Sequence, residues 1–296
     1  MKNLIAVFIY LLLLISGVSC SEDEYSTTKT TTTTEPSLIV KFKFDTNQVR
    51  LDGTGQPASV AAGNAAQNPI FNAISAHYLE LTPNALTQVG QGTIVYRGAE
   101  TVVGGANAID FGQAKIMAQD DVFLKIPLKD IAAGSYEFLR VSLTYQNFGI
   151  NILNSGVEYP GTLASFVGIN TYIGTFNIGN NQFNVNGNRA QGYWAFAIDN
   201  QPFSSSGQAP AGATTVPNPL AATSPIPTGS CLVTGKFANN LVISGNETRD
   251  VRVTLSLSIN NSFEWKEVNF DGKFEPASGE SVVDMGLRGL IPSFVK

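Results

Sequence analysis

The sequence has few charged side chains, a single histidine and two cysteines, and each shortage excludes a class of protein. One His and two Cys among 296 residues exclude a histidine-rich metal centre, a zinc-finger array and a disulfide framework. Only 14% of residues are charged, against about 25% in an average soluble domain, so Gly, Asn, Gln, Ser and Thr supply much of the polar surface. The net charge of -5, with basic residues scattered singly, argues against a nucleic-acid partner.

The N-terminal segment has the organisation of a bacterial export signal. Lys2 precedes an unbroken apolar run from Leu4 to Ile15, which is short for a membrane span and typical of a signal peptide. The run leads into Ser16-Gly17-Val18-Ser19-Cys20, which resembles a bacterial lipobox with Gly17 where Leu is usual. The resemblance implies cleavage after residue 19, acylation of Cys20 and attachment to a membrane by lipid. The alternative is an ordinary signal peptide that contains a cysteine.

A polar segment separates Cys20 from the first apolar strand pattern. Ser21-Glu22-Asp23-Glu24 resembles the signal that directs lipoproteins of Bacteroidetes-type bacteria to the cell surface; the alternative is a solvated acidic run. Residues 27–34 are threonine except for Lys29, and such a tract cannot bury enough apolar area to fold. We therefore expect a signal peptide at 1–19, a lipidated disordered tether at 20–36 and a folded domain at 37–296.

The domain itself has the patterns of an all-β protein. Apolar residues alternate with polar ones over 38–44, 139–145 and 251–259, which predicts strands with one buried face in antiparallel sheets. Turn residues such as Gly, Asn and Pro separate shorter strand candidates, at 76–82, 93–97, 122–128, 163–169, 172–177, 191–198, 231–237 and 263–270. A short helix is expected only at 281–291. The prediction is an elaborated, single-domain antiparallel β-sandwich.

Two segments are expected to be long loops. Residues 52–70 are rich in Ala, Gly, Asn and Pro, and residues 199–230 are rich in Pro, Ser, Ala and Thr. Loops of that length in a compact domain are either functional or disordered. The composition of 199–230 favours disorder.

Loops rich in Asp and Asn suggest calcium as the one metal cofactor to consider. Oxygen-rich loops suit this hard cation, and the candidate ligands are Asp45, Asn47, Asp52 and Asp271. None of them fits the EF-hand spacing. The alternative is that these side chains cap turns through their own backbone.

Three aromatic residues are the candidate ligand contacts. Tyr193 and Trp194 are neighbours in one predicted strand, and Trp265 is the other tryptophan. A flat aromatic side chain on a rigid sheet can stack on a sugar ring or anchor a protein partner. Because Tyr193 and Trp194 point to opposite faces, at least one of them can face solvent. The alternative is that both tryptophans fill the core.

No catalytic motif stands out. The chain lacks a nucleophile elbow, a P-loop, a His-Glu-x-x-His motif and a dinucleotide fingerprint. His77 is the only imidazole, and either it is satisfied by a neighbour within a strand or it serves as a ligand or base. Carboxylate-pair hydrolysis needs two acids about 5–10 Å apart; the candidates are Glu80, Glu137, Glu158, Asp199 and Glu264. Cys231 opens an apolar strand and is expected to be a buried, inert thiol.

Several segments together resemble the MbnP-type bacterial β-sandwich proteins. They are Leu-Ile-Val-Lys-Phe-Lys-Phe44, Ile74-Ser-Ala-His-Tyr-Leu-Glu-Leu81, Phe123-Leu-Lys-Ile-Pro-Leu128, Ala133-Gly-Ser-Tyr-Glu137, Arg140-Val-Ser-Leu143 and Gly192-Tyr-Trp-Ala-Phe196. The resemblance implies the fold and a periplasmic or outer-membrane location. It does not carry a copper site to this chain, because His77, Met117 and Met285 are too few ligands for one.

These observations lead to one functional expectation and two alternatives. The expectation is a non-enzymatic outer-membrane lipoprotein, lipid-anchored at Cys20 and exposed at the cell surface, that binds an extracellular glycan or a surface protein. One alternative is a structural or assembly subunit of an outer-membrane complex, stabilised by calcium. The other is a carboxylate-based hydrolase.

Overall fold

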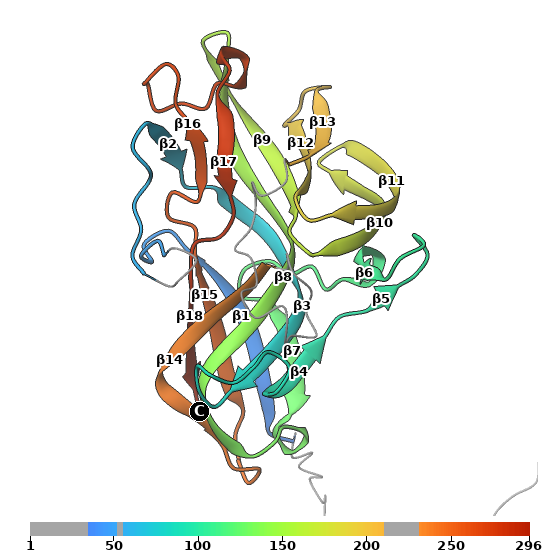
Figure 1. The fold of residues 1–296 in the computed structure, drawn as a ribbon, viewed down its shortest axis with the longest axis vertical. Coiled ribbons are helices and arrows are strands. Elements are labelled where there is room, and N and C mark those ends of the chain that lie inside the picture. Colours follow the sequence, from blue (N-terminus) through green and yellow to red (C-terminus); the bar gives the residue numbers. More distant parts are fainter. Residues whose placement is uncertain (1–34, 52–55, 210–230) are drawn as a thin grey trace, which may run out of the picture. The chain divides into compact units, whose positions relative to one another are not determined.

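The computed structural model describes residues 35–51, 56–209 and 231–296, and Glu35–Lys296 form one compact unit. This unit consists of β-strands and a few 3-10 turns (Figure 1), which confirms the all-β fold class. The described turns are η1 (Phe111–Gln113), η2 (Leu128–Asp130) and η4 (Pro276–Ser278). The expected signal peptide, the acylated Cys20 and the threonine-rich tether lie outside the described residues. Within the described ranges no helix is both long and apolar enough to cross a membrane.

One face of the sandwich is a four-stranded sheet, the β1 sheet, in the order β18-β15-β1-β7. Its strands are β1 (Ser37–Asp45), β7 (Val122–Pro127), β15 (Val251–Ser258) and β18 (Leu290–Val295). β1 and β15 run parallel, unlike the other pairs of this sheet. Parallel neighbours need a long connection, and here nearly the whole domain lies between the two strands. This pair is a departure from the expected antiparallel pattern.

The opposing β8 sheet is organised around one strand of 21 residues, β8 (Gly134–Asn154). The first half of β8 pairs with β14 and its second half with β9, while β3 runs along the other edge. β9 continues through β12 to β13, and β3 pairs with β4. The bounds are β3 (Ile70–Thr82), β4 (Thr93–Arg97), β9 (Val157–Phe166), β12 (Tyr193–Ile198), β13 (Ser204–Gln208) and β14 (Cys231–Ile243).

The first half of the β8 sheet packs on the β1 sheet and encloses the largest core cluster. The alternating apolar residues predicted over 38–44 and 251–259 are its main components, together with Leu139, Val141 and Leu143 of the stripe predicted over 139–145. The last residue of that stripe, Tyr145, belongs to a second cluster. The polar residues on the opposite face of β8 are also buried, Arg140 and Ser142 among them. The segment that joins β3 to β4 covers that face with Val89, and its Thr87 carbonyl accepts a hydrogen bond from Arg140.

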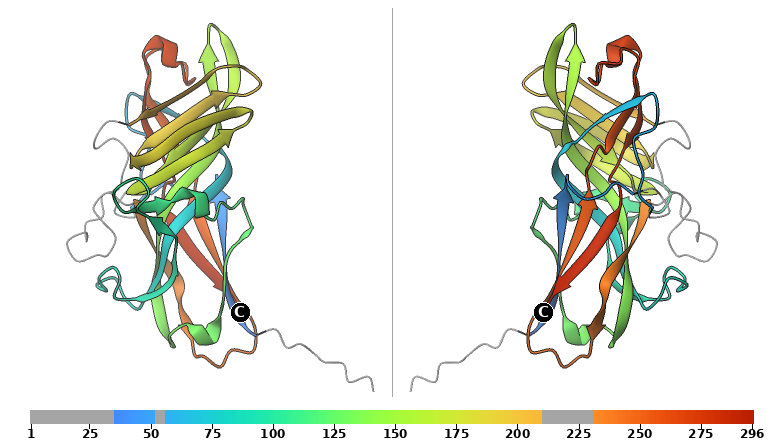
Figure 2. Two further views of the ribbon diagram at one scale, coloured as in Figure 1. Left: turned by 90° about the vertical axis from the view of Figure 1, so that its right-hand side faces the viewer. Right: turned by 90° about the vertical axis from the view of Figure 1, so that its left-hand side faces the viewer.

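The second half of the β8 sheet is covered on both faces by smaller sheets. The β16 sheet packs on one face and contains β2 (Asn64–Gln67), β16 (Phe263–Lys266) and β17 (Ser281–Met285). The β10 sheet packs on the other and contains β5 (Glu100–Thr101), β6 (Ala108–Asp110), β10 (Asn170–Ile178) and β11 (Asn181–Ala190). The left view of Figure 2 looks onto β10 and β11 of the β10 sheet, and the right view looks from the opposite side, which carries β2 and β16 of the β16 sheet.

β12 illustrates why this part has three layers. Its odd-numbered residues Tyr193, Ala195 and Ala197 belong to the core cluster beneath the β10 sheet. Its even-numbered residues Trp194, Phe196 and Ile198 belong to the cluster beneath the β16 sheet. Successive side chains of a strand point to opposite faces, so a strand with apolar residues at every position must be covered twice.

Three segments differ from the sequence predictions. The helix expected at 281–291 is wrong, because these residues form β17 and the start of β18. The loop expected at 52–70 contains β2, and the loop expected at 199–230 contains β13. Both are edge strands held by backbone hydrogen bonds, which need no apolar side chains. Residues 52–55 and 210–230 lie outside the described part of the chain.

Candidate ligand pocket

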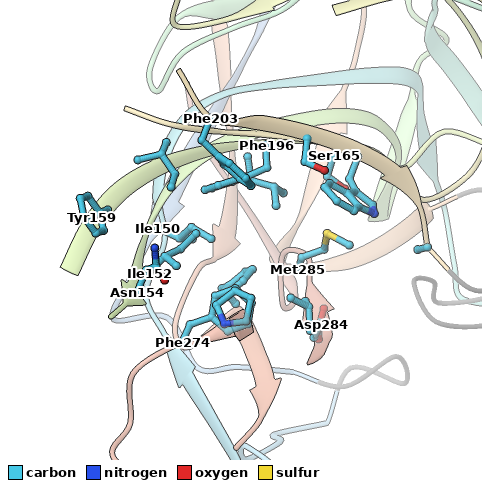
Figure 3. Close-up of a pocket in the computed structure, with 18 of the residues that line it drawn as sticks. Ile150, Ile152, Asn154, Tyr159, Ser165, Phe196, Phe203, Phe274, Asp284 and Met285 are labelled. Carbon is cyan, nitrogen blue, oxygen red and sulfur yellow. The ribbon is translucent and has the colours of Figure 1, made fainter. Parts of the chain in front are cut away.

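A pocket of about 890 Å³ lies between the second half of the β8 sheet and the β16 sheet. Its volume is within the range of about 300–1,000 Å³ that is usual for small-molecule sites. Figure 3 shows Phe196 and Phe203 on one wall and Phe274 and Met285 on the other. The remaining described apolar lining comes mostly from Ile150, Ile152, Leu153, Tyr159, Leu163, Val167, Trp194, Ile198, Phe263, Pro276, Ala277, Val282 and Val283.

Two glycines allow the aromatic wall to lie close to the neighbouring strands. A Cβ at Gly161 would collide with the ring of Phe196, and one at Gly207 would lie 2.8 Å from Cζ2 of Trp194. Gly207 is the cross-strand partner of Trp194. The missing side chain on β13 therefore lets the Trp194 indole lie over that strand at the edge of the pocket.

Asp284 is the one carboxylate among the described lining residues, and its charge is balanced. It forms an ion pair with Arg288, and its Oδ2 is 3.9 Å from Nη2 of Arg50. Arg50 in turn pairs with the buried Glu264. Burial raises the pKa of Glu264, but hydrogen bonds from Asn64, the Ala61 backbone and Arg50 outweigh it and leave the pKa below its usual value.

The polar residue that sequence reasoning missed is Gln146. It is 1% exposed and lines the pocket, and its Nε2 donates to the carbonyl oxygen of Met285 at 3.4 Å. No donor in the described part of the chain reaches its Oε1. Gln146 lies opposite Ser165 of β9, and Ser165 lies opposite Trp194 of β12. The three residues thus form one row across the pocket face of the sheet.

The structure separates the three aromatic residues predicted to contact a ligand. Trp265 is fully buried with Phe263 and Phe274, and Tyr193 is buried on the opposite face of β12 against Phe166. These positions correct the expectation that either presents a surface to a ligand. Trp194 is half-buried and lines the pocket. In the sequence, the alternation of residues 193–198 separates the two faces of the strand. It does not indicate which of the two faces lines a pocket.

Asp45 and Asp271, two of the predicted calcium ligands, are each engaged within their own turn. Oδ1 of Asp45 accepts the backbone N–H groups of Asn47 and Gln48, and its Oδ2 pairs with Lys43, which with those turn contacts lowers the pKa of Asp45. Asp271 caps its own turn by accepting the N–H of Lys273, and Asp52 lies outside the described residues. No group of three or more acidic, histidine or cysteine side chains suited to a metal occurs in the described ranges.

The other titratable candidates have separate partners or surroundings. The buried His77 has its Nε2 3.0 Å from Oε1 of Glu100, and burial lowers its pKa more than Glu100 raises it. Burial also raises the pKa of the Cys231 thiol to about 11. The five candidate hydrolytic carboxylates have separate partners, namely Arg140 for Glu80, Lys236 for Glu137, Lys273 for Glu158, Thr162 for Asp199 and Arg50 for Glu264.

Two neighbouring carboxylates do occur, Glu267 and Glu280, at the two ends of the segment that carries Phe274 into the pocket. Glu267 and Glu280 are both buried. Burial, together with the neighbouring charge of Glu280, raises the pKa of Glu267. Oε1 of Glu267 accepts the N–H of Asp271, and Glu280 accepts the N–H groups of Val268 and Glu275. The pair therefore holds the two ends of the 267–280 segment together and is most favourable when it retains a proton.

Comparisons with protein families, with characterised proteins and with solved structures find no match to this chain. The pocket and the N-terminal motif are therefore the two features of this chain that point to a function.

Proposed function

We propose that the protein is a lipid-anchored cell-surface protein that binds a small, largely apolar ligand in the pocket between the β8 and β16 sheets. The observation that carries this proposal is the pocket itself, with about 890 Å³ of volume and a mainly aliphatic and aromatic lining. A concave, mostly apolar site with a few polar groups is the usual form of a small-molecule site.

The pocket favours an apolar ligand over the glycan expected from the sequence. Sugar rings need an aromatic platform surrounded by hydrogen-bonding side chains, because each hydroxyl that loses water must be satisfied. Of the three expected aromatic contacts, Trp194 alone lines the pocket. Its neighbours there are mainly hydrocarbon, such as Phe196 and Ile198. These surroundings favour the burial of an apolar body. They do not replace the hydrogen bonds with water that a polyhydroxyl ring would lose.

The membrane part of the proposal depends on Cys20 and the acidic cluster that follows it. Acylation of Cys20 would tether the domain through residues 21–36. Growth with labelled palmitate should label the wild-type protein and not Cys20→Ala, and protease added to intact cells should remove the domain. An unlabelled wild-type chain, or a domain fully protected from protease, would contradict this part.

The pocket is tested with N-phenyl-1-naphthylamine, an uncharged probe whose fluorescence rises in apolar surroundings. We expect saturable binding to the wild-type protein. Phe203→Ala should weaken it about tenfold, because an apolar side chain of this size contributes about 1.5–3 kcal/mol when fully buried and Phe203 is 53% exposed before binding.

Phe270→Ala is the matched control, because Phe270 is 78% exposed and does not line the pocket. It should bind the probe like the wild type. Absence of saturable binding, or equal losses in the two variants, would refute the proposed pocket function.

A further inference from the structure

Gln146 has a buried acceptor, Oε1, that has no hydrogen-bond partner among the described residues. Because the Met285 carbonyl can only accept, the amide nitrogen of Gln146 must face it, as the 3.4 Å contact shows. Oε1 therefore points away from Met285, and no hydrogen-bond donor of the described residues reaches it. A buried carbonyl without a partner is costly. Its place in the lining of an apolar pocket indicates that a ligand supplies the donor.

The charge of the lining restricts the ligand further. No Lys or Arg is among the described lining residues, and Asp284, the one carboxylate, is already paired with arginine. A ligand carboxylate would lose its hydration without gaining a cation, and it would meet the Gln146 acceptor and Asp284. A ligand ammonium would find its only counter-charge already balanced by Arg288 and Arg50. An ion buried without a partner is strongly disfavoured.

We infer that the ligand is an uncharged amphipathic molecule, with a hydrocarbon body along Phe196 and Phe274 and a hydroxyl or N–H group that donates to Oε1 of Gln146. This inference rests on the proposed function and specifies its ligand class. Ser165 is the cross-strand partner of Gln146 and lines the same pocket. Its hydroxyl provides a further hydrogen-bonding group beside Gln146. A neutral lipid alcohol belongs to this class, whereas a free fatty acid does not.

The test is displacement of N-phenyl-1-naphthylamine by three ligands with the same ten-carbon chain. Decanol has a donor, methyl decanoate has acceptors only, and decanoate at pH 8 is an anion. We expect decanol to displace the probe at a concentration about tenfold lower than either of the others, since one satisfied buried acceptor is worth about that factor.

Two variants assign the preference to one side chain. Gln146→Met keeps the length of the side chain and removes the acceptor, so decanol and methyl decanoate should compete equally in it. Gln201→Met is the matched control, because Gln201 also lines the pocket but is exposed to solvent; it should keep the preference for decanol.

The outcomes separate this inference from the proposed function. Probe binding with equal competition by decanol and methyl decanoate in the wild type, or with decanoate as the best competitor, would overturn the ligand class and leave the pocket function standing. Absence of probe binding would overturn both. The wild-type ranking decides the matter even if Gln146→Met does not fold.

Discussion

Replacing Glu80 by Ala should remove a large part of the stability of the domain, because this carboxylate is completely buried and satisfies three donors. Its side chain is 0% exposed. Oε1 accepts the N–H groups of Gly90 and Gly92 at 2.9 and 2.7 Å, and Oε2 lies 3.5 Å from Nη1 of Arg140. Arg140 is also buried and donates through Nη2 to the carbonyl of Thr87. Glu80 thus holds the segment between β3 and β4 against the β8 sheet.

The magnitude follows from the groups that Glu80→Ala leaves behind. Removing one partner of a buried ion pair costs about 3–5 kcal/mol, and each buried N–H without a partner costs about 1–3 kcal/mol. These costs overlap, since water entering the vacated space would serve both the guanidinium and the two amides. We therefore expect a loss of about 3–5 kcal/mol, a large fraction of the roughly 5–15 kcal/mol that stabilises a typical domain.

Urea unfolding followed by tryptophan fluorescence measures this loss. The double variant Glu80→Leu/Arg140→Leu should recover part of it, because no buried charge remains, but the amides of Gly90 and Gly92 stay unsatisfied. Glu158→Ala is the control: its ion pair with Lys273 is 49% exposed on both sides, so no measurable change is expected. A loss below about 1 kcal/mol for Glu80→Ala, the value of a surface pair, would refute the reasoning.

Two further substitutions test the pocket and its supporting segment. Gly207→Ala places a methyl group 2.8 Å from the Trp194 indole, so we expect probe binding to weaken about fivefold; Gly174→Ala, where a Cβ meets nothing within 4 Å, should bind normally. Glu267→Gln should raise the urea midpoint at pH 8 and not at pH 4. The raised pKa of Glu267 means that protonation stabilises the fold at low pH and that this stability is lost as pH rises through the folded-state pKa. An unchanged difference between variant and wild type across this range would contradict the role of the pair.

Strands with strict alternation could be predicted from the sequence. The apolar residues of 38–44 and 251–259 are the inward faces of β1 and β15, since a period of two is a local property of the chain. Their parallel pairing could not be predicted, because it depends on which distant segments meet. The structure of residues 281–291 could not be predicted either. Their apolar residues are compatible with a short helix, and they form a strand because β17 pairs with the distant strand β16.

The candidate site shows the same division. Local sequence identified Trp194 and Trp265 as aromatic residues on strands, and nothing in their neighbourhoods distinguishes one from the other. Trp265 is in the core because Phe263 and Phe274 pack around it, and Trp194 lines a pocket because Gly207 leaves space on the neighbouring strand.

By itself, then, the sequence determined the all-β class, the main strands and the expectation of a lipid anchor at Cys20, since each depends on residues close together in the chain. The tertiary structure alone decided where the sheets leave a pocket and which polar group faces it. Gln146 and Met285, whose contact orients the side-chain amide of Gln146, are 139 residues apart in sequence. Only the stacking of the β16 sheet on the β8 sheet brings them together, because hydrophobic burial selects which faces meet and local patterns do not encode that choice.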